Sequence, residues 1–269
     1  MDCGGSHVDF VSIERQGRIA VVRFDRGQPA NPLSYAAMRE LTSAARSFDD
    51  DPEVSAIVLT GRADNFSMGA DLKDAENIGL RSAPMAHRRL ALMTGARLCR
   101  AWEDVQALTI SSIEGWCVGG GVALAVSTDL RVIGASGGMY VPEIERGMNM
   151  SWGSVPRITN LVGPARAKRI VVLAEKIMAE RAVAWGLADE VAADGNSFEM
   201  AMAMAERAAA LPPVAVRMCK QDINAYANAL AHVAAHSDYD QYALAQSGKD
   251  FEEGVASFLE KRPPRYTGG

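Results

Sequence analysis

Two glycine-containing turns and one glutamate are the residues of this sequence best suited to chemistry. Residues 65–73 follow one short apolar run, and residues 115–124 follow another about fifty residues later. Glycines among small residues at a strand-to-helix junction leave backbone N–H groups uncovered, and two such groups can stabilise one oxyanion. Glu143 follows Pro142 after a third apolar run. A carboxylate facing an oxyanion hole is the minimum needed to remove a proton next to a carbonyl.

The alternative for Glu143 is a solvated loop residue, which is the commoner place for a lone glutamate. The catalytic interpretation gains support if both glycine turns lie at adjacent strand ends of the same sheet, because ligands of such sheets bind there. From the residues alone, both interpretations stay open.

Other common sites fail on inspection. Leu124 stands where a G-x-G-x-x-G motif would need its last glycine, and no G-K-[ST] occurs. His232 and His236 have i, i+4 spacing but no clear third ligand, so no metal site is predicted.

Composition restricts the class of protein. The chain has 269 residues, 48% of them hydrophobic, and a formal net charge of −5. This balance argues against a broad nucleic-acid-binding face, and no apolar run approaches the ~20 residues that cross a bilayer. The N-terminus lacks a signal-peptide pattern. The four cysteines, Cys3, Cys99, Cys117 and Cys219, are scattered, which indicates free, mostly buried thiols and a cytoplasmic location.

The elements that must position the site alternate between strands and helices over the first part of the chain. Strands are expected at 8–14, 19–25, 55–60, 109–113, 130–133 and 139–141, and helices at 34–48, 84–105 and 121–127. In the 84–105 helix, Leu90, Met93, Leu98 and Trp102 are the expected buried residues. The recurrence of strand, strand and helix predicts stacked ββα units with a mostly parallel sheet.

The later part of the chain is expected to be almost entirely helical. Helices are predicted at 164–173, 179–185, 197–211, 214–234 and 251–262, before an extended tail. These helices are rich in alanine, and several have apolar residues on more than one face. This is typical of helices that pack on a partner subunit or on the sheet domain. The expected division is a core of residues 1–195 with the active site and a helical region of residues 196–269.

These motifs together resemble the crotonase (enoyl-CoA hydratase/isomerase) superfamily over nearly the whole chain. Residues 66–73 resemble its first oxyanion motif, and 115–124 with Asp129 resemble its second. Pro142-Glu143 resembles the segment with a catalytic glutamate, and 182–188 and 258–262 resemble later landmarks. Because these motifs occur in the expected order and at the expected spacing, they are specific for membership of the superfamily. They are much less specific for the reaction.

The resemblance implies an α/β fold, a crotonase-like ββα superhelix with a C-terminal α-helical trimerisation region, assembled as a homotrimer or a hexamer. It implies an acyl-CoA thioester substrate, coenzyme A as part of that substrate, no permanently bound cofactor, and neither nucleic acid nor membrane as partner. The backbone N–H groups of Ala70 and Gly120 would hold the thioester oxygen. Residues implied in substrate or CoA binding are Ala30, Leu33, Met68, Asp71, Leu72, Lys73, Gly119, Pro142, Trp152, Phe258 and Lys261. Each lysine could equally be an exposed solubilising charge.

Two departures from the family pattern bear on the reaction. Ala123 stands where hydratases of the family have a glutamate, and alanine can neither position water nor transfer protons. Glu143 alone can still move a proton from C2 to C4 of a 3-enoyl thioester, which favours a Δ3,Δ2-enoyl-CoA isomerase. Alternatives are a hydratase for an unusual acyl group and a catalytically silent acyl-CoA-binding subunit. The second departure is the segment after Glu143, where Trp152 would narrow the acyl pocket or belong to the core.

Overall fold

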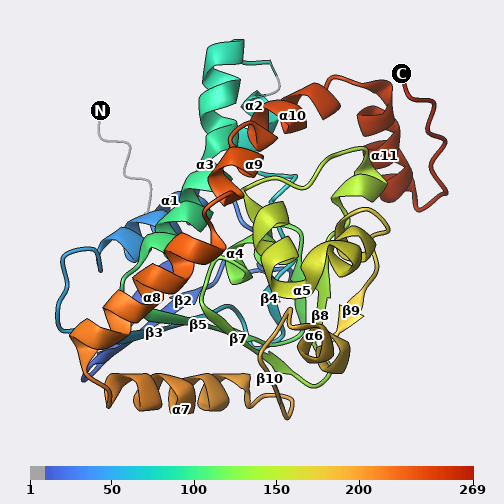
Figure 1. The fold of residues 1–269 in the computed structure, drawn as a ribbon. Helices are drawn as coiled ribbons and strands as arrows, with labels where there is room; N and C mark the ends of the chain where they lie inside the picture. The colour runs from blue at the N-terminus through green and yellow to red at the C-terminus, as the bar shows by residue number, and fades with distance from the viewer. Residues whose placement is uncertain (1–9, 81) are drawn as a thin grey trace.

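The computed structural model describes residues 10–80 and 82–269 and contains two β-sheets surrounded by helices (Figure 1). The strands are β1 (Val11–Gln16), β2 (Ile19–Phe24), β3 (Ala56–Thr60), β4 (Asn65–Ser67), β5 (Leu108–Ile113), β6 (Trp116–Val118), β7 (Leu130–Gly134), β8 (Gly138–Tyr140), β9 (Ile177–Met178) and β10 (Glu190–Ala192). The helices are α1 (Tyr35–Arg46), α2 (Ala75–Leu80), α3 (Met85–Asp104), α4 (Gly120–Ala125), the 3-10 helix η1 (Glu143–Arg146), α5 (Ser154–Val171), α6 (Ala179–Trp185), α7 (Ser197–Ala209), α8 (Pro213–Ala227), α9 (Ala231–Ala235), α10 (Asp238–Ala245) and α11 (Lys249–Glu260).

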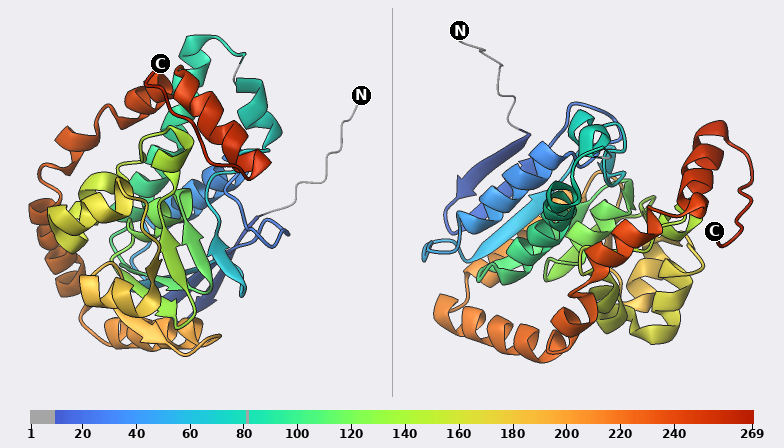
Figure 2. Two further views of the ribbon diagram at one scale, coloured as in Figure 1. Left: turned by 90° about the vertical axis from the view of Figure 1, so that its right-hand side faces the viewer. Right: turned by 90° about the horizontal axis from the view of Figure 1, so that it is seen from above.

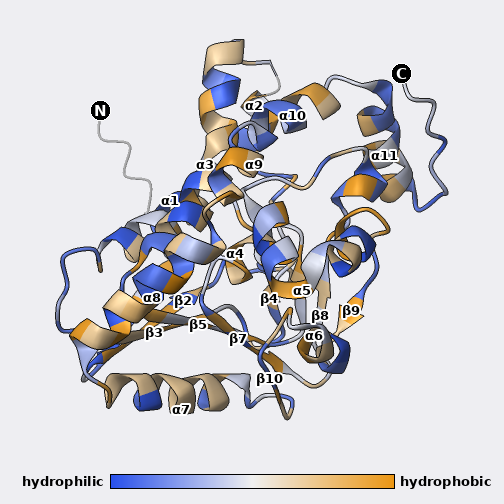
Figure 3. Cartoon of the chain, viewed as in Figure 1, coloured by the Kyte–Doolittle hydropathy of each residue, from blue (hydrophilic) through white to orange (hydrophobic). Residues whose placement is uncertain are grey.

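The large sheet has the strand order β1-β2-β3-β5-β7-β10. Its first two strands form the predicted antiparallel hairpin, and the other pairs are parallel. All five residues of β3 are buried because both faces of the sheet are covered. α7 packs on one face through Ala201, Ala205 and Ala208, and the main core lies on the other. Figure 3 shows the apolar residues along these strands and along α7.

The small sheet has the order β4-β6-β8-β9 and positions the site. Along the chain, β3 leads into β4, β5 into β6 and β7 into β8, and each short strand precedes a helical segment. This confirms the predicted ββα recurrence and the mixed α/β fold. The short strands β4 and β6 were not predicted, because they lie inside the segments 65–73 and 115–124 that were interpreted as glycine turns. β8 is equally short and overlaps the predicted strand 139–141.

Most predicted helices are present, with some corrections. Ser34 caps α1 as expected, accepting a hydrogen bond from the Ala37 amide at 3.1 Å. Leu98 and Trp102 of α3 are buried, but the prediction for Leu90 is wrong because this side chain is exposed. The first helix of the later part begins at Ser154 and has a non-helical break at Gly163, just before Pro164.

The last helices form a separate layer around the core. The helix predicted over 214–234 is divided into α8 and α9, and α10 was not predicted. α10 packs on α3, α9 on α5, and α11 on η1. α11 lies at the end of the molecule opposite α7 (Figures 1 and 2). The division at residue 195 stays a prediction.

The described cysteines are free thiols. Cys99 and Cys117 are buried as expected, whereas Cys219 is exposed and corrects the prediction of a buried thiol; Cys3 lies outside the described residues. In the described part of the chain, no cluster of three or more candidate metal ligands occurs. None of the helices there is long and apolar enough to cross a membrane.

Candidate active site

The two glycine turns meet at the ends of adjacent strands. β4 and β6 pair in parallel, with Ser67 opposite Cys117, so their carboxyl ends lie at one edge of the small sheet. A Cβ atom at Gly120 would lie 3.4 Å from the Ala70 nitrogen. Across residues 10–80 and 82–269, neither the Ala70 nor the Gly120 amide donates to a protein acceptor. Two neighbouring free N–H groups are the arrangement that an oxyanion hole requires.

The first turn needs glycine and is fixed by the early loop. Gly69 has a φ of 90°, and a Cβ atom there would lie 2.8 Å from the Val118 carbonyl oxygen. Ser67 Oγ accepts from the Gly69 amide at 3.1 Å and donates to the Asn31 carbonyl at 2.8 Å. The Leu33 amide donates to the Gly69 carbonyl at 2.8 Å. These bonds direct that carbonyl away and leave the next amide, that of Ala70, free.

The second turn is fixed to the strand that leads to Glu143. Gly119, with a φ of 52°, donates its amide to the Tyr140 carbonyl at 2.8 Å. Its carbonyl accepts from the Ala123 amide at 3.0 Å, the first hydrogen bond of α4. The Gly120 amide is therefore at the helix start, where the N–H groups have no partner within the helix.

Glu143 is the first residue of η1 and is separated from the end of β8 by Val141 and Pro142. Its carboxylate lies against the second turn. A Cβ atom at Gly119 would lie only 2.5 Å from Glu143 Oε1. Oε2 is sheltered from solvent and has no hydrogen-bond partner, although the residue as a whole is partly exposed. Burial raises the pKa of Glu143 to about 7, against the smaller opposing effects of a backbone hydrogen bond and Arg146. Such a group can both accept and return a proton near neutral pH.

A second carboxylate is missing at the position next to the glycine run. Ala123 is fully buried in the main core on α4. Glu145, two residues after Glu143, is exposed and accepts a hydrogen bond from the Tyr140 hydroxyl. Among these three positions, only Glu143 has a carboxylate against the glycine turns, so the geometry provides one acid/base group.

The residues predicted to bind substrate fall into two groups. Ala30, Met68, Asp71, Leu72 and Lys73 are exposed or partly exposed around the first turn, and Gly119, Pro142 and Trp152 lie around the second. Leu33 is the exception in the first group: its side chain is buried, and it reaches the turn only through its backbone. Asp71 is paired with Arg26 at 3.2 Å.

Of the two C-terminal residues predicted to bind CoA, Phe258 lies beside η1. The Arg146 guanidinium lies 4.3 Å from the centre of the Phe258 ring. Lys261 follows α11 as its exposed C-cap. This chain therefore places its own Phe258 near the segment that begins with Glu143.

Trp152 lies at the site, and its supporting residues could not be found from the sequence. A Cβ atom at Gly120 would lie 2.7 Å from Cη2 and Cζ3 of its indole, and one at Gly95 would overlap the ring. Gly95 is an inconspicuous residue within α3. Asp238, on the unpredicted helix α10, accepts from the Gly153 amide at 2.6 Å. No sequence motif indicated either residue.

Comparisons with known proteins agree with this geometry. The family model described as enoyl-CoA hydratase/isomerase matches residues 14–269. A probable enoyl-CoA hydratase of Mycobacterium tuberculosis is 30% identical over 263 residues, covering 96% of this chain and 98% of that protein. The short-chain-enoyl-CoA hydratase of Clostridium acetobutylicum is 27% identical, covering 94% and 95%. The crystal structure of carnitinyl-CoA hydratase from Mycobacterium avium has a TM-score of 0.85 at 28% identity, covering 97% and 100%. The chain belongs to the enoyl-CoA hydratase/isomerase family of the crotonase superfamily.

Proposed function

We propose that the protein shifts the double bond of a 3-enoyl-CoA thioester to the 2-position, with Glu143 as its single acid/base group. The observation that supports this proposal is the isolated Glu143 carboxylate beside the glycine turns, with Ala123 at the other carboxylate position. Double-bond migration needs one group that takes and returns a proton, whereas hydration must also position a water molecule.

The proposed reaction is balanced within the substrate and one side chain. The Glu143 carboxylate removes a proton from C2, and the electron pair moves into the conjugated system and onto the thioester oxygen. The Ala70 and Gly120 amides stabilise that oxygen in the dienolate; one lost donor of this kind typically costs ~10²–10³ in rate. Glu143 then returns the proton at C4, which gives the 2-enoyl thioester and restores the carboxylate.

The second candidate is hydration of a 2-enoyl thioester. It is favoured by the names of the relatives, which include a short-chain-enoyl-CoA hydratase and a 2,3-dehydroadipyl-CoA hydratase of Escherichia coli. Glu143 would then act on a water molecule that adds at C3, without a second carboxylate to hold it.

A direct comparison of substrates separates the two. Purified protein is offered 3-hexenoyl-CoA and crotonyl-CoA side by side, with Glu143→Gln as the inactive variant and Glu145→Gln as the matched control. We expect isomerisation of the first substrate, abolished only by the change at Glu143. Robust hydration of crotonyl-CoA would instead identify the protein as a hydratase. Binding of CoA thioesters without turnover across a substrate panel would favour a silent binding subunit.

We also propose that residues 196–269 build a homotrimer or a hexamer in the cytoplasm. Support comes from the large apolar side chains left exposed on α8 and after it: Val214, Met218, Ile223, Tyr226, Leu230 and Val233. Tyr226 is 89% exposed, which is unfavourable for so large an aromatic side chain unless another surface covers it. Light scattering after size exclusion tests this: we expect a trimer or hexamer, and a monomer from Ile223→Asp. A monomeric wild-type protein would contradict the proposal.

A further inference from the structure

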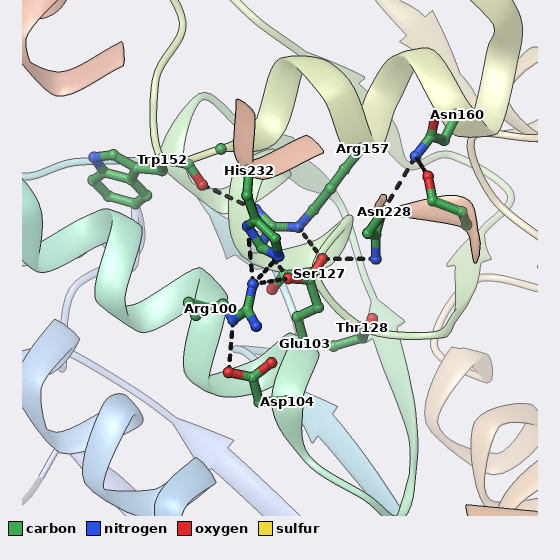
Figure 4. Close-up of polar contacts among 12 residues, drawn as sticks. Arg100, Glu103, Asp104, Ser127, Thr128, Trp152, Arg157, Asn160, Asn228 and His232 are labelled. Atoms are coloured by element: carbon green, nitrogen blue, oxygen red, sulfur yellow. Dashed lines mark hydrogen bonds and ion pairs between the residues drawn. The ribbon is translucent and has the colours of Figure 1, made fainter. Parts of the chain in front are cut away.

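Trp152 is held in its position by two hydrogen bonds to the peptide group that joins it to Gly153. Arg157 Nη1 donates to the Trp152 carbonyl at 3.0 Å, and Asp238 Oδ2 accepts from the Gly153 amide at 2.6 Å. Arg157 is itself fixed by two hydrogen bonds to Glu103, at 2.9 and 3.0 Å (Figure 4). Buried charge-assisted bonds of this kind restrict the geometry of the groups they join.

The backbone of Trp152 has an unusual conformation. Its φ is 61°, in the left-handed region that side chains other than glycine seldom adopt, and Gly153 follows with a φ of 68°. This turn directs the indole to the oxyanion hole, where it lies against Gly120 and Gly95. Because α3 lies behind the ring at Gly95, the indole cannot withdraw in that direction without displacing the helix.

The position of the indole restricts where an acyl group can go. A thioester whose oxygen is held by Ala70 and Gly120 has its C2 next to the Glu143 carboxylate. In the proposed function, the CoA part leaves along the exposed residues after Ala70, namely 71–73. The acyl chain is assigned to the side of the hole where the Trp152 ring contacts Gly120.

We infer that Trp152 is the specificity-determining wall of the acyl pocket and restricts the substrate to short acyl groups. The inference rests on the proposed placement of the thioester at the Ala70 and Gly120 amides, and it holds for either isomerisation or hydration. Arg157 and Asp238 are positioning residues that fix the wall, and Gly95 is the residue on which the ring packs.

The test compares acyl-chain length profiles for wild type and two variants. Trp152→Gly removes the indole and suits the left-handed backbone, and Trp152→Phe keeps a smaller ring. The readout is the ratio of kcat/KM for a ten-carbon over a six-carbon 3-enoyl-CoA. Wild type should favour the short substrate, and Trp152→Gly should raise the ratio on the order of 10- to 100-fold, with Trp152→Phe in between. Trp185→Phe, at a partly buried tryptophan on α6, is the matched control and should leave the ratio unchanged.

Binding measurements keep this test separate from the proposed reaction. Calorimetry with the saturated thioesters butyryl-CoA and decanoyl-CoA reports chain-length preference without turnover. Loss of the short-chain preference in Trp152→Gly supports the inference even if no double bond is moved. An unchanged preference in a Trp152→Gly protein with a normal circular dichroism spectrum, or a wild type that binds both chain lengths equally, would overturn it. Failure of wild type to bind any acyl-CoA would overturn both proposals.

Discussion

Replacing Glu143 with glutamine should make the protein more stable at neutral and alkaline pH while it abolishes activity. The pKa of Glu143 rises from 4.5 to about 7 on folding because burial disfavours the charged form. Each pKa unit corresponds to about 1.4 kcal/mol, so the ionised carboxylate lowers the free energy of unfolding by about 3 kcal/mol. Glutamine has nearly the same shape and carries no charge, so it removes this cost.

The sign and the pH window follow from the two pKa values. Below pH 4.5 the carboxyl group is protonated in both the folded and the unfolded chain, and wild type and Glu143→Gln should have similar stability. Between pH 4.5 and about 7 the unfolded chain releases its proton and the folded chain retains it, so wild type loses stability as the pH rises. Above about pH 7 the difference should be constant.

Urea unfolding from pH 4 to pH 9 measures this difference directly. We expect Glu143→Gln to exceed wild type by up to about 3 kcal/mol at pH 8 and by little at pH 4. Glu145→Gln, a substitution of an exposed glutamate on the same turn, should stay within about 0.5 kcal/mol at every pH. A Glu143→Gln protein that is no more stable than wild type at pH 8, or a difference in stability that does not depend on pH, would contradict a raised pKa of Glu143 in the folded protein.

Three further predictions concern the turn, the base and the support of the site. In wild type, kcat/KM should fall tenfold per pH unit below about pH 7, as Glu143 becomes protonated; a flat profile between pH 5 and 7 would contradict a Glu143 base. Gly69→Ala should reduce kcat by ~10² or more, because the new methyl group meets the Val118 carbonyl and displaces the hole; full activity would count against this geometry. Glu103→Ala should lower the free energy of unfolding in urea by about 3 to 5 kcal/mol, because it leaves the buried Arg157 without its ion-pair partner. Asp104→Ala removes an exposed carboxylate and should lower it by less than about 1 kcal/mol. Equal losses in the two variants would be inconsistent with a buried pair of Glu103 and Arg157.

The two glycine turns and Glu143 could be singled out because local sequence determines them, whereas Ala70 and Gly120 were named as the two donors from the family resemblance. Glycine at Gly69 is required by backbone conformation, and the apolar runs before each turn define strands whose ends must lie together. The expectation that both turns lie at adjacent strand ends is confirmed, although the strands concerned are the short ones of the small sheet. The residue roles themselves stay predictions.

The support of Trp152 could not be predicted because it depends on contacts between distant parts of the chain. Gly95 lies in the middle of a helix with no sequence feature that shows what packs on it. Asp238 is 85 residues from Gly153, whose amide donates to it, and it begins a helix that composition did not reveal. Leu90 was expected to be buried from its spacing, but in the described part of the chain no segment covers its side chain closely enough to exclude solvent. Hydrophobic period alone does not report such tertiary contacts.

Cleavage of the C2–H bond is the step on which the proposed mechanism depends, and a label at C2 detects it whether the proton moves to C4 or exchanges with solvent. A 3-enoyl-CoA carrying deuterium at C2 is incubated in H₂O with wild type, Glu143→Gln or Glu145→Gln, and the label at C2 and C4 is followed by NMR. We expect rapid loss of the label from C2 with wild type and Glu145→Gln, and a rate lower by ~10²–10⁴ with Glu143→Gln. Loss at the wild-type rate in Glu143→Gln would contradict a Glu143 base, and no loss from C2 in wild type beyond the uncatalysed rate would contradict the enolate itself.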